Sequence, residues 1–514
     1  MLKWIGGSKP DHPLADAKRA KTILAEIPAG DPIKALEEIA YWLDSLNRTE
    51  GFKLDARFDL LDQFDQIAKN HQRKLSQEYL VQRLQKFQEN RLWTTVFNFW
   101  RQLGAGYISC VEGFQSGDAG ALGMRADLPA VTARALRALT LQLKWLLLRY
   151  GPIDDRMWGD FGRVYLFAEA KGFADKSAQI YPGKHGVSTV RQEFVKAMML
   201  AASSTDGLQP LQLEIAERTV AHFSSLFEFA STPNEACAYY FDLSMRKPPA
   251  RMMKSVEVTP TMRFFGAGKA GAALAELHKY VVEQGVPPAD VNLGGTYERA
   301  VLLEVLKHLE VYWAPTPPAR SSERKRATAR LTVVHGFAEV LRNAEPEESD
   351  SLDFSEPDTE SWVVDNVSDG GYGAIVPSVK GDWIKVGSLV GLKPENSAHW
   401  STGVVRRITR DDKQMRRVGI QVFAKAVIPV RVAPAAGNGS AAGAVSDGEQ
   451  AVLLSTRPDN NGEVGLLVRP ERYTPSQMLS MQVRDKLYLL RPTRLVERGQ
   501  EYDLARFKIT AAGR

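Results

Sequence analysis

Apolar residues in the N-terminal part of the chain recur at helical spacing. In residues 33–43 they return every three or four positions, directly after the helix start signal Gly30-Asp31-Pro32. The same pattern marks four more segments, at residues 58–92, 133–150, 208–230 and 297–313. Strand-like alternation is scarce before residue 313. The pattern therefore predicts an all-α domain over residues 1–313.

The sequence is compatible with two arrangements of these helices. Trp158, Phe161, Gly162 and Tyr165 match the first-helix spacing of a tetratricopeptide-type repeat, and Ala174 falls at a second-helix position. The rest of that unit does not match, and no regular repeat period is found. A helical-repeat-like architecture and an irregular bundle are both compatible with the pattern.

The pattern changes after a proline-rich stretch at residues 314–322, which marks a linker between domains. From residue 323 onward, short β-branched or alternating stretches are bounded by Gly, Asn or Asp. They lie at residues 331–340, 362–365, 383–392, 403–408 and 418–422. Closely spaced short strands predict a small antiparallel β-barrel over residues 323–432.

Two compositionally biased segments interrupt this β half. Residues 345–360 are acidic and poor in apolar side chains, which predicts a flexible loop inserted between two strands. Residues 433–447, rich in Ala and Gly, form a predicted linker. Residues 448–514 contain four more strand-like stretches, which either complete the barrel or form a second one. The predicted fold class is a multidomain α+β protein, helical first and β afterwards.

Composition narrows the classes of function. The 514 residues carry a net charge of +5, with 25% charged and 44% apolar residues, as in ordinary soluble proteins. This small net charge and the acidic stretch disfavour nucleic-acid binding. Cys110 and Cys237 are too far apart in sequence to suggest a disulfide framework or a metal site. Because we find neither a signal peptide nor an apolar stretch long enough to span a membrane, we expect a cytoplasmic protein.

The candidate chemistry begins with two arginines four residues apart, Arg326 and Arg330. Arginine presents a planar fork of donors that pairs with phosphate oxygens or with the O6/N7 edge of guanine. Arg324 and Lys325 add positive charge beside them and are secondary candidates. We find no HExxH metal spacing and no nucleophile elbow, so we expect a non-enzymatic protein without cofactor or metal.

A second motif follows the acidic stretch. Asn366 and Ser368 are short polar residues able to bond the edges of a base. Gly370, Gly371 and Gly373 permit backbone conformations closed to other residues and let a ligand approach the main chain. Alone, each motif is more often a solvated hinge or an ordinary turn. The two together, in this order and among strands, are more specific.

Arg326-x-x-x-Arg330 followed by Asn366-x-Ser368-x-x-Gly371 resembles the signature of PilZ domains, which are bacterial receptors for cyclic di-GMP. Residues 403–408 and 417–423 are similar to later strands of that barrel, so the resemblance covers about residues 323–430. The resemblance implies that the two arginines hold phosphates and guanine edges. It also implies that the Asn, Ser and Gly positions hold a guanine from the other side.

Two departures from the PilZ pattern are present. Position 366 is Asn where many members have Asp, and the acidic insertion lengthens the connection between the motifs, where its carboxylates can compete for the arginines. The resemblance implies a cyclic di-GMP receptor. We expect the dinucleotide to order the linker and so reorient the helical domain, which would bind a protein partner. The alternative is a constitutive helical scaffold with a degenerate barrel that binds no dinucleotide.

Overall fold

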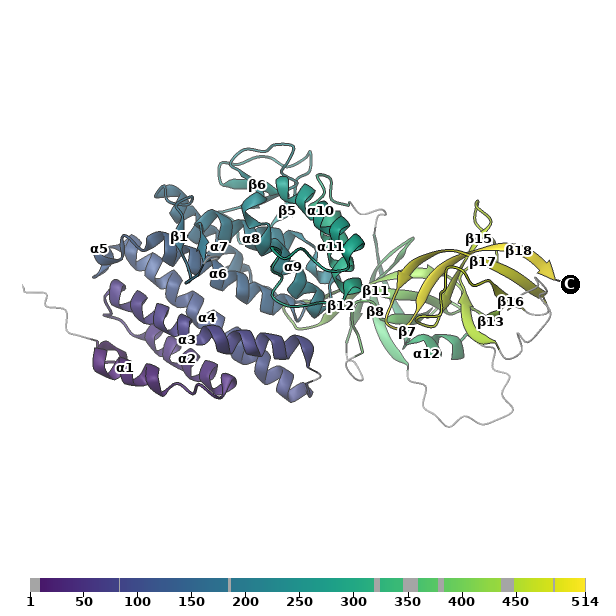
Figure 1. The fold of residues 1–514 in the computed structure, drawn as a ribbon, viewed down its shortest axis with the longest axis horizontal. Coiled ribbons are helices and arrows are strands. Elements are labelled where there is room, and N and C mark those ends of the chain that lie inside the picture. The colour runs from purple at the N-terminus through teal and green to yellow at the C-terminus, as the bar shows by residue number, and fades with distance from the viewer. Residues whose placement is uncertain are drawn as a thin grey trace, which may run out of the picture. The chain divides into compact units, whose positions relative to one another are not determined.

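The computed structural model describes residues 10–82, 84–183, 186–318, 324–344, 359–377, 383–435, 448–483 and 486–513. The chain forms two compact units, Met1–Pro318 and Ala319–Arg514. The first unit is mainly helical and the second mainly β (Figure 1). This confirms the predicted α+β class. Much of the two predicted linkers and nearly all of the acidic stretch lie outside the described residues.

The helices of the first unit pack around α6, which is buried along most of its length. Helix α6 contacts α4, α7 and α8. Helix α2 begins where predicted, since Pro32 occupies the first turn and Asp31 accepts a hydrogen bond from the amide of Lys34. The helices are α1 (Ala17–Glu26), α2 (Pro32–Arg48), α3 (Leu54–Val81), α4 (Lys86–Ser116), α5 (Ala121–Met124), α6 (Leu128–Leu147), α7 (Asp155–Ala170), α8 (Val190–Ala202), α9 (Pro210–His222), α10 (Lys269–Gln284) and α11 (Arg299–Trp313).

Two predicted helical segments differ from the structure. Residues 58–92 fall on two helices, because Gln85 caps the start of α4 in a reciprocal pair with Gln88. Residues 208–230 contain α9, but their last three residues form a strand in which Phe229 pairs with Phe265. In this second case a long-range sheet pairing overrides the local helical pattern.

The first unit also contains a small antiparallel sheet that the helical pattern did not predict. It has the order β3-β6-β4-β5 and lies beside the helices (Figure 1). A separate two-stranded hairpin joins β1 to β2. The strands are β1 (Ala178–Gln179), β2 (Val187–Ser188), β3 (Glu228–Ala230), β4 (Tyr239–Asp242), β5 (Ala250–Arg251) and β6 (Met262–Gly266).

The tetratricopeptide-like residues pack against this sheet region instead of a repeat partner. Trp158 and Phe161 are buried on α7, and Trp158 also contacts Phe241 of β4. Gly162 lies so close to the carbonyl of Leu243 that a Cβ there would come within 2.4 Å of its oxygen. Ala174 follows the end of α7 and is not on a helix, so its assignment to a second repeat helix was wrong.

The second unit begins with a closed six-stranded barrel in the order β10-β11-β12-β9-β8-β7, with β10 pairing back to β7. All of its strand pairs are antiparallel. Its elements are β7 (Lys325–His335), α12 (Phe337–Arg342), β8 (Glu360–Ser368), β9 (Gly371–Val376), β10 (Leu389–Pro394), β11 (Ser401–Arg410) and β12 (Arg416–Ala424).

The predicted strand at residues 331–340 was placed too late in the chain. Strand β7 begins at Lys325 and ends at His335, where Gly336 adopts a φ of +84°. Residues 337–342 then form α12, whose Phe337 and Val340 are buried. The predicted strand at residues 383–392 is likewise shorter, since β10 begins at Leu389.

A second closed barrel follows, in the order β13-β14-β15-β18-β17-β16. The C-terminal strands therefore form their own barrel and do not complete the first. Strand β13 starts inside the range predicted for the first barrel but belongs to the second. The strands are β13 (Ile428–Pro434), β14 (Glu449–Leu453), β15 (Glu463–Val468), β16 (Leu479–Val483), β17 (Lys486–Arg498) and β18 (Asp503–Gly513).

The two barrels share an apolar interface. Helix α12, with Leu389 and Val404 of the first barrel, packs against Val452 and Leu467 of the second. An ion pair between Arg406 and Glu497, at 2.5 Å, lies at the same junction. The barrels are therefore held together within one unit.

Candidate functional site

The Asn-Ser-Gly motif forms the hairpin between β8 and β9. Asn366 is directly opposite Gly373, and Ser368 is directly opposite Gly371. The Ser368 hydroxyl donates a long hydrogen bond, 3.4 Å, to the Gly371 carbonyl across the turn. The motif residues are therefore positioned by strand register and do not lie in an irregular loop.

The arginine motif lies on the neighbouring strand β7. Arg326 is directly opposite Asn366, and Arg330 is directly opposite Val363. Adjacent strands are about 4.8 Å apart, so the side chains of one motif are within reach of a small molecule bound by the other. The structure thus brings together all five predicted residues, Arg326, Arg330, Asn366, Ser368 and Gly371.

These residues share the outer face of the barrel because of an irregularity in register. Val363 and Asn366 are three positions apart, so a regular strand would point them to opposite faces. Asp365 is an extra residue relative to β9, between the pairs formed by Val364 and Asn366. This bulge returns Asn366 to the outer face, where Val363 and Arg330 are exposed.

The face carries two cationic groups without acidic partners. Arg326 and Arg330 are exposed, and neither forms an ion pair or side-chain hydrogen bond with any residue that the structure describes. Asp365, the nearest acidic residue on β8, is held by Arg417 at 2.9 Å. Asp365 also accepts a 2.5 Å hydrogen bond from the Asn366 amide. Among the described residues, no acidic side chain therefore occupies the donors of the two arginines, and such donors suit an anion.

The glycines of the motif act through close approach. Gly371 and Gly373 do not have the positive φ that requires glycine, so the predicted role of unusual backbone conformation was wrong. A Cβ on Gly371 would come within 1.8 Å of the Ile420 carbonyl oxygen, and one on Gly373 within 2.3 Å of the Asn366 amide nitrogen. A Cβ on Gly370 would meet nothing within 4 Å. Glycine is thus needed at Gly371, where the clash is with backbone, whereas a side chain at position 373 would displace the Asn366 amide.

The pairing of β12 with β9 places further residues at the candidate site, which the motifs in the sequence did not identify. Gly419 of β12 is opposite Gly373, and Arg417 is opposite Ile375, so both lie on the same outer face. The alternation of Arg417, Gly419 and Gln421 with apolar residues was the signal that pointed to this face. Of the secondary candidates, Arg324 and Lys325 are exposed at the start of β7.

The site contains groups suited to an organic anion, and the described residues include no cluster of His, Cys, Asp or Glu able to hold a metal ion. Paired arginine forks bind phosphate oxygens, and short amide and hydroxyl groups bond base edges. Across the described helices, none is long and apolar enough to cross a membrane.

Comparison with protein families gives two matches, in succession along the chain. Residues 18–234 match the N-terminal domain of the cyclic-di-GMP receptor FimW, and residues 338–429 match its middle PilZ domain. No curated protein matches the chain. The second match includes the Asn-Ser-Gly hairpin but starts after the two arginines of β7. Together the matches cover more than half of the chain, in the order of one receptor. The chain therefore belongs to the FimW family of cyclic-di-GMP receptors and contains a PilZ domain.

Proposed function

We propose that this protein is a non-enzymatic receptor for cyclic di-GMP, which binds on the outer face of the first barrel. Arg326 and Arg330 would hold the phosphates and a guanine edge, and Asn366, Ser368 and Gly371 would hold a guanine. The observation that carries this proposal is the register, which sets two arginines without an acidic partner among the described residues beside the Asn-Ser-Gly hairpin. The family match supports the choice of ligand.

We further propose that the dinucleotide controls the direction in which the chain leaves the barrel. Arg326 and Arg330 already lie on β7, so ordering of that segment by the ligand is not required. Arg324 directly precedes this strand and Lys325 is its first residue, at the end that leads to the helical unit. A ligand bound across β7 and β8 would restrain this end of the strand and so reorient the helical unit, which would bind a protein partner.

The cytoplasm is the compartment that we propose for this receptor. Cys110 and Cys237 are buried free thiols in the described structure. Burial is the largest influence on both, and it raises the pKa of Cys110 to about 12 and that of Cys237 to about 11. Such thiols remain protonated and unreactive at neutral pH, as expected of structural cysteines in a reducing compartment.

Calorimetric titration of the full chain with cyclic di-GMP tests the binding site. Losing one charged, directional contact costs about 2–3 kcal/mol, so Arg326→Ala and Arg330→Ala should each weaken affinity about 30- to 150-fold. Arg431→Ala, an exposed arginine on β13 of the second barrel, is the matched control and should bind as the parent does. Unchanged affinity in both β7 variants, or no binding by the parent, would refute the assignment.

Small-angle scattering tests the reorientation separately. The proposal predicts a change in the scattering profile when saturating cyclic di-GMP is added to the parent, and no change for the Arg326→Ala/Arg330→Ala double variant. Identical profiles of the parent with and without ligand, under conditions where calorimetry shows saturation, would rule out the switch while leaving the binding site intact.

A further inference from the structure

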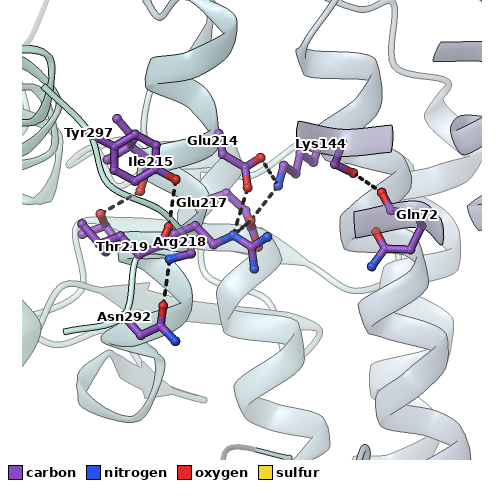
Figure 2. Close-up of polar contacts among 12 residues, drawn as sticks. Gln72, Lys144, Glu214, Ile215, Glu217, Arg218, Thr219, Asn292 and Tyr297 are labelled. Carbon is purple, nitrogen blue, oxygen red and sulfur yellow. Dashed lines mark hydrogen bonds and ion pairs between the residues drawn. The ribbon is translucent and has the colours of Figure 1, made fainter. Parts of the chain in front are cut away.

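The helical unit contains a cavity of about 730 Å³, far along the chain from the PilZ motifs. Residues of α3, α6, α8 and α9 line it, together with residues 292–297. Figure 2 shows part of its wall, where Lys144 of α6 reaches toward α9. This volume is within the range of small-molecule sites, which are commonly about 300–1,000 Å³.

Four of the charged groups in the wall neutralise one another. Lys144 contacts Glu214 at 2.5 Å and Glu217 at 2.9 Å, and Arg218 contacts Glu214 at 2.9 Å (Figure 2). Burial alone would raise the pKa of Glu217, but the charges of Lys144 and Arg218 lower it to about 2. Glu214 and Glu217 are therefore paired with the basic side chains of Lys144 and Arg218.

A further acidic residue of the wall is paired in the same way. Glu193 of α8 contacts Lys196 at 2.6 Å. Asp65 of α3 accepts hydrogen bonds from the hydroxyls of Tyr107, at 3.0 Å, and Tyr181, at 2.9 Å. Burial is the largest influence on Asp65 and raises its pKa. Most of the acidity in the wall is thus neutralised within it.

The basic side chains left over converge on the same cavity. Arg137 of α6 lies over the ring of Tyr181 at 4.9 Å, and its Nε is buried without a hydrogen-bond partner. Lys69 and Arg73 are four residues apart, so they lie on one face of α3. Neither they nor Arg137 forms an ion pair within the part of the chain that the structure describes.

A buried donor without a hydrogen-bond partner, such as the Nε of Arg137, is unusual in a folded protein, since buried polar groups are nearly always satisfied. The charges of Glu193, Glu217 and Asp65 act on this guanidinium without satisfying that donor. Seven basic and five acidic side chains line the cavity, which leaves an excess of positive charge. Aromatic rings from Trp145, Tyr181 and Tyr297 line it as well. A fork donor in the wall, cations at the rim and aromatic faces fit a phosphorylated small molecule.

We propose that this cavity is a second ligand site, which binds a small phosphate-bearing anion in the helical unit. Arg137 would contact the phosphate in the wall, and Lys69 and Arg73 would contact it from α3. The ion pairs of Lys144 and Lys196 would keep the wall in shape and would not contact the ligand. This site is independent of the cyclic di-GMP site on the barrel.

Calorimetry with inorganic pyrophosphate as the probe tests this proposal. The protein is the full chain carrying Arg326→Ala/Arg330→Ala, so that the barrel site cannot account for binding. Pyrophosphate should bind this background, and Lys69→Glu/Arg73→Glu should weaken its affinity at least about tenfold. Arg137→Gln should weaken it further. Lys21→Glu, an exposed lysine of α1 away from the cavity, is the matched control and should have no effect.

Three outcomes would overturn the proposal. One is the absence of any binding heat up to about 10 mM pyrophosphate, where a site of useful affinity would be saturated. The second is equal affinity in the background and in Lys69→Glu/Arg73→Glu, whose exposed positions leave folding undisturbed even if Arg137→Gln fails to fold. The third is citrate binding as tightly as pyrophosphate, which would remove the preference for phosphate.

Discussion

The strands of the two barrels follow the chain in the same circular order. The first is closed as β7-β8-β9-β12-β11-β10 and the second as β13-β14-β15-β18-β17-β16, so each strand of one has a counterpart in the other. The family match to a PilZ domain covers the first barrel from α12 onward, without β7, and only the start of β13 in the second. One topology therefore occurs twice in the second unit.

The difference between the barrels lies on one corresponding outer face. In the first barrel, Asn366, Gly373 and Gly419 form a row across β8, β9 and β12 beside the two arginines of β7. In the second, the corresponding row across β14, β15 and β18 is Val452, Leu467 and Leu504. These three are 0%, 0% and 8% exposed, because they pack against the first barrel.

Barrel topology alone therefore does not create the proposed ligand site. The same face is polar and open in one copy and apolar and covered in the other, and side chains alone make the difference. The second barrel instead supports the first. Its Glu497 holds Arg406, which in turn donates a 2.8 Å hydrogen bond to Gln421 at the edge of the proposed site.

The largest expected effect is a loss of stability, caused by placing a polar side chain on the face of the second barrel that packs against the first. Val452→Asp would bury an unpaired carboxylate between the barrels and should lower the free energy of unfolding by about 3–5 kcal/mol. Val363→Asp, at an outward position of β8 that is 38% exposed, is the matched control and should change it by less than about 0.5 kcal/mol. Denaturant unfolding measures both, and equal stability of the two variants would contradict the comparison.

The next effect concerns close packing of β9 on β12. Gly371→Ala would place a Cβ 1.8 Å from the Ile420 carbonyl oxygen, so the two strands must separate. We expect cyclic di-GMP affinity to fall more than about tenfold, as for loss of a well-positioned contact. Gly370→Ala meets open space and should bind normally. Equal titration curves for the two alanine variants would show that the hairpin geometry does not matter.

A smaller loss of cyclic di-GMP affinity is expected from substituting Asn366, the position where this chain departs from many PilZ domains. Asn366→Asp would replace the amide that donates to Asp365, at 2.5 Å, with a second carboxylate. Like charges raise the pKa of such a pair, so the variant should bind cyclic di-GMP about threefold to tenfold more weakly at pH 7.5. The deficit should shrink toward pH 5 as one carboxyl is protonated. A deficit independent of pH would point to lost hydrogen bonding alone.

The smallest effect tests the supporting role of the second barrel. Glu497→Gln removes the charge that holds Arg406 and should weaken cyclic di-GMP affinity no more than about threefold, because a partly exposed ion pair contributes little. Titration of the variant beside the parent measures the ratio. A loss beyond about tenfold would mean that the second barrel belongs to the site itself.

The sequence was sufficient to predict the helical-to-β division and to select the residues that the structure brings together at the proposed site. Helical spacing and the caps that begin α2 are local features, and Arg326 and Asn366 are recognisable by type and spacing. That these two residues face each other was not predictable in detail. It depends on pairing between strands separated by the acidic stretch and on a register shift between Arg326 and Ala329 of β7, next to the bulge at Asp365.

The remaining misses also depend on contacts between distant residues. Residues 228–230 have a helical pattern but form β3 because β6, more than thirty positions later, pairs with them. Residues 337–342 form α12 because Phe337 and Val340 bury against the second barrel. Burial of Val452 likewise depends on that interface. The spacing of apolar residues within one segment does not reveal which distant residues that segment will contact.

Hydrogen exchange of the full chain, with and without saturating cyclic di-GMP, tests the central claim most directly. If cyclic di-GMP binds on the first barrel as proposed, it should slow exchange in residues 325–330 and 366–373, and we predict this result. We predict no change in residues 428–434 and 449–453, the corresponding strands of the second. Protection confined to the second barrel or to the helical unit, with the first barrel unchanged, would contradict the proposal.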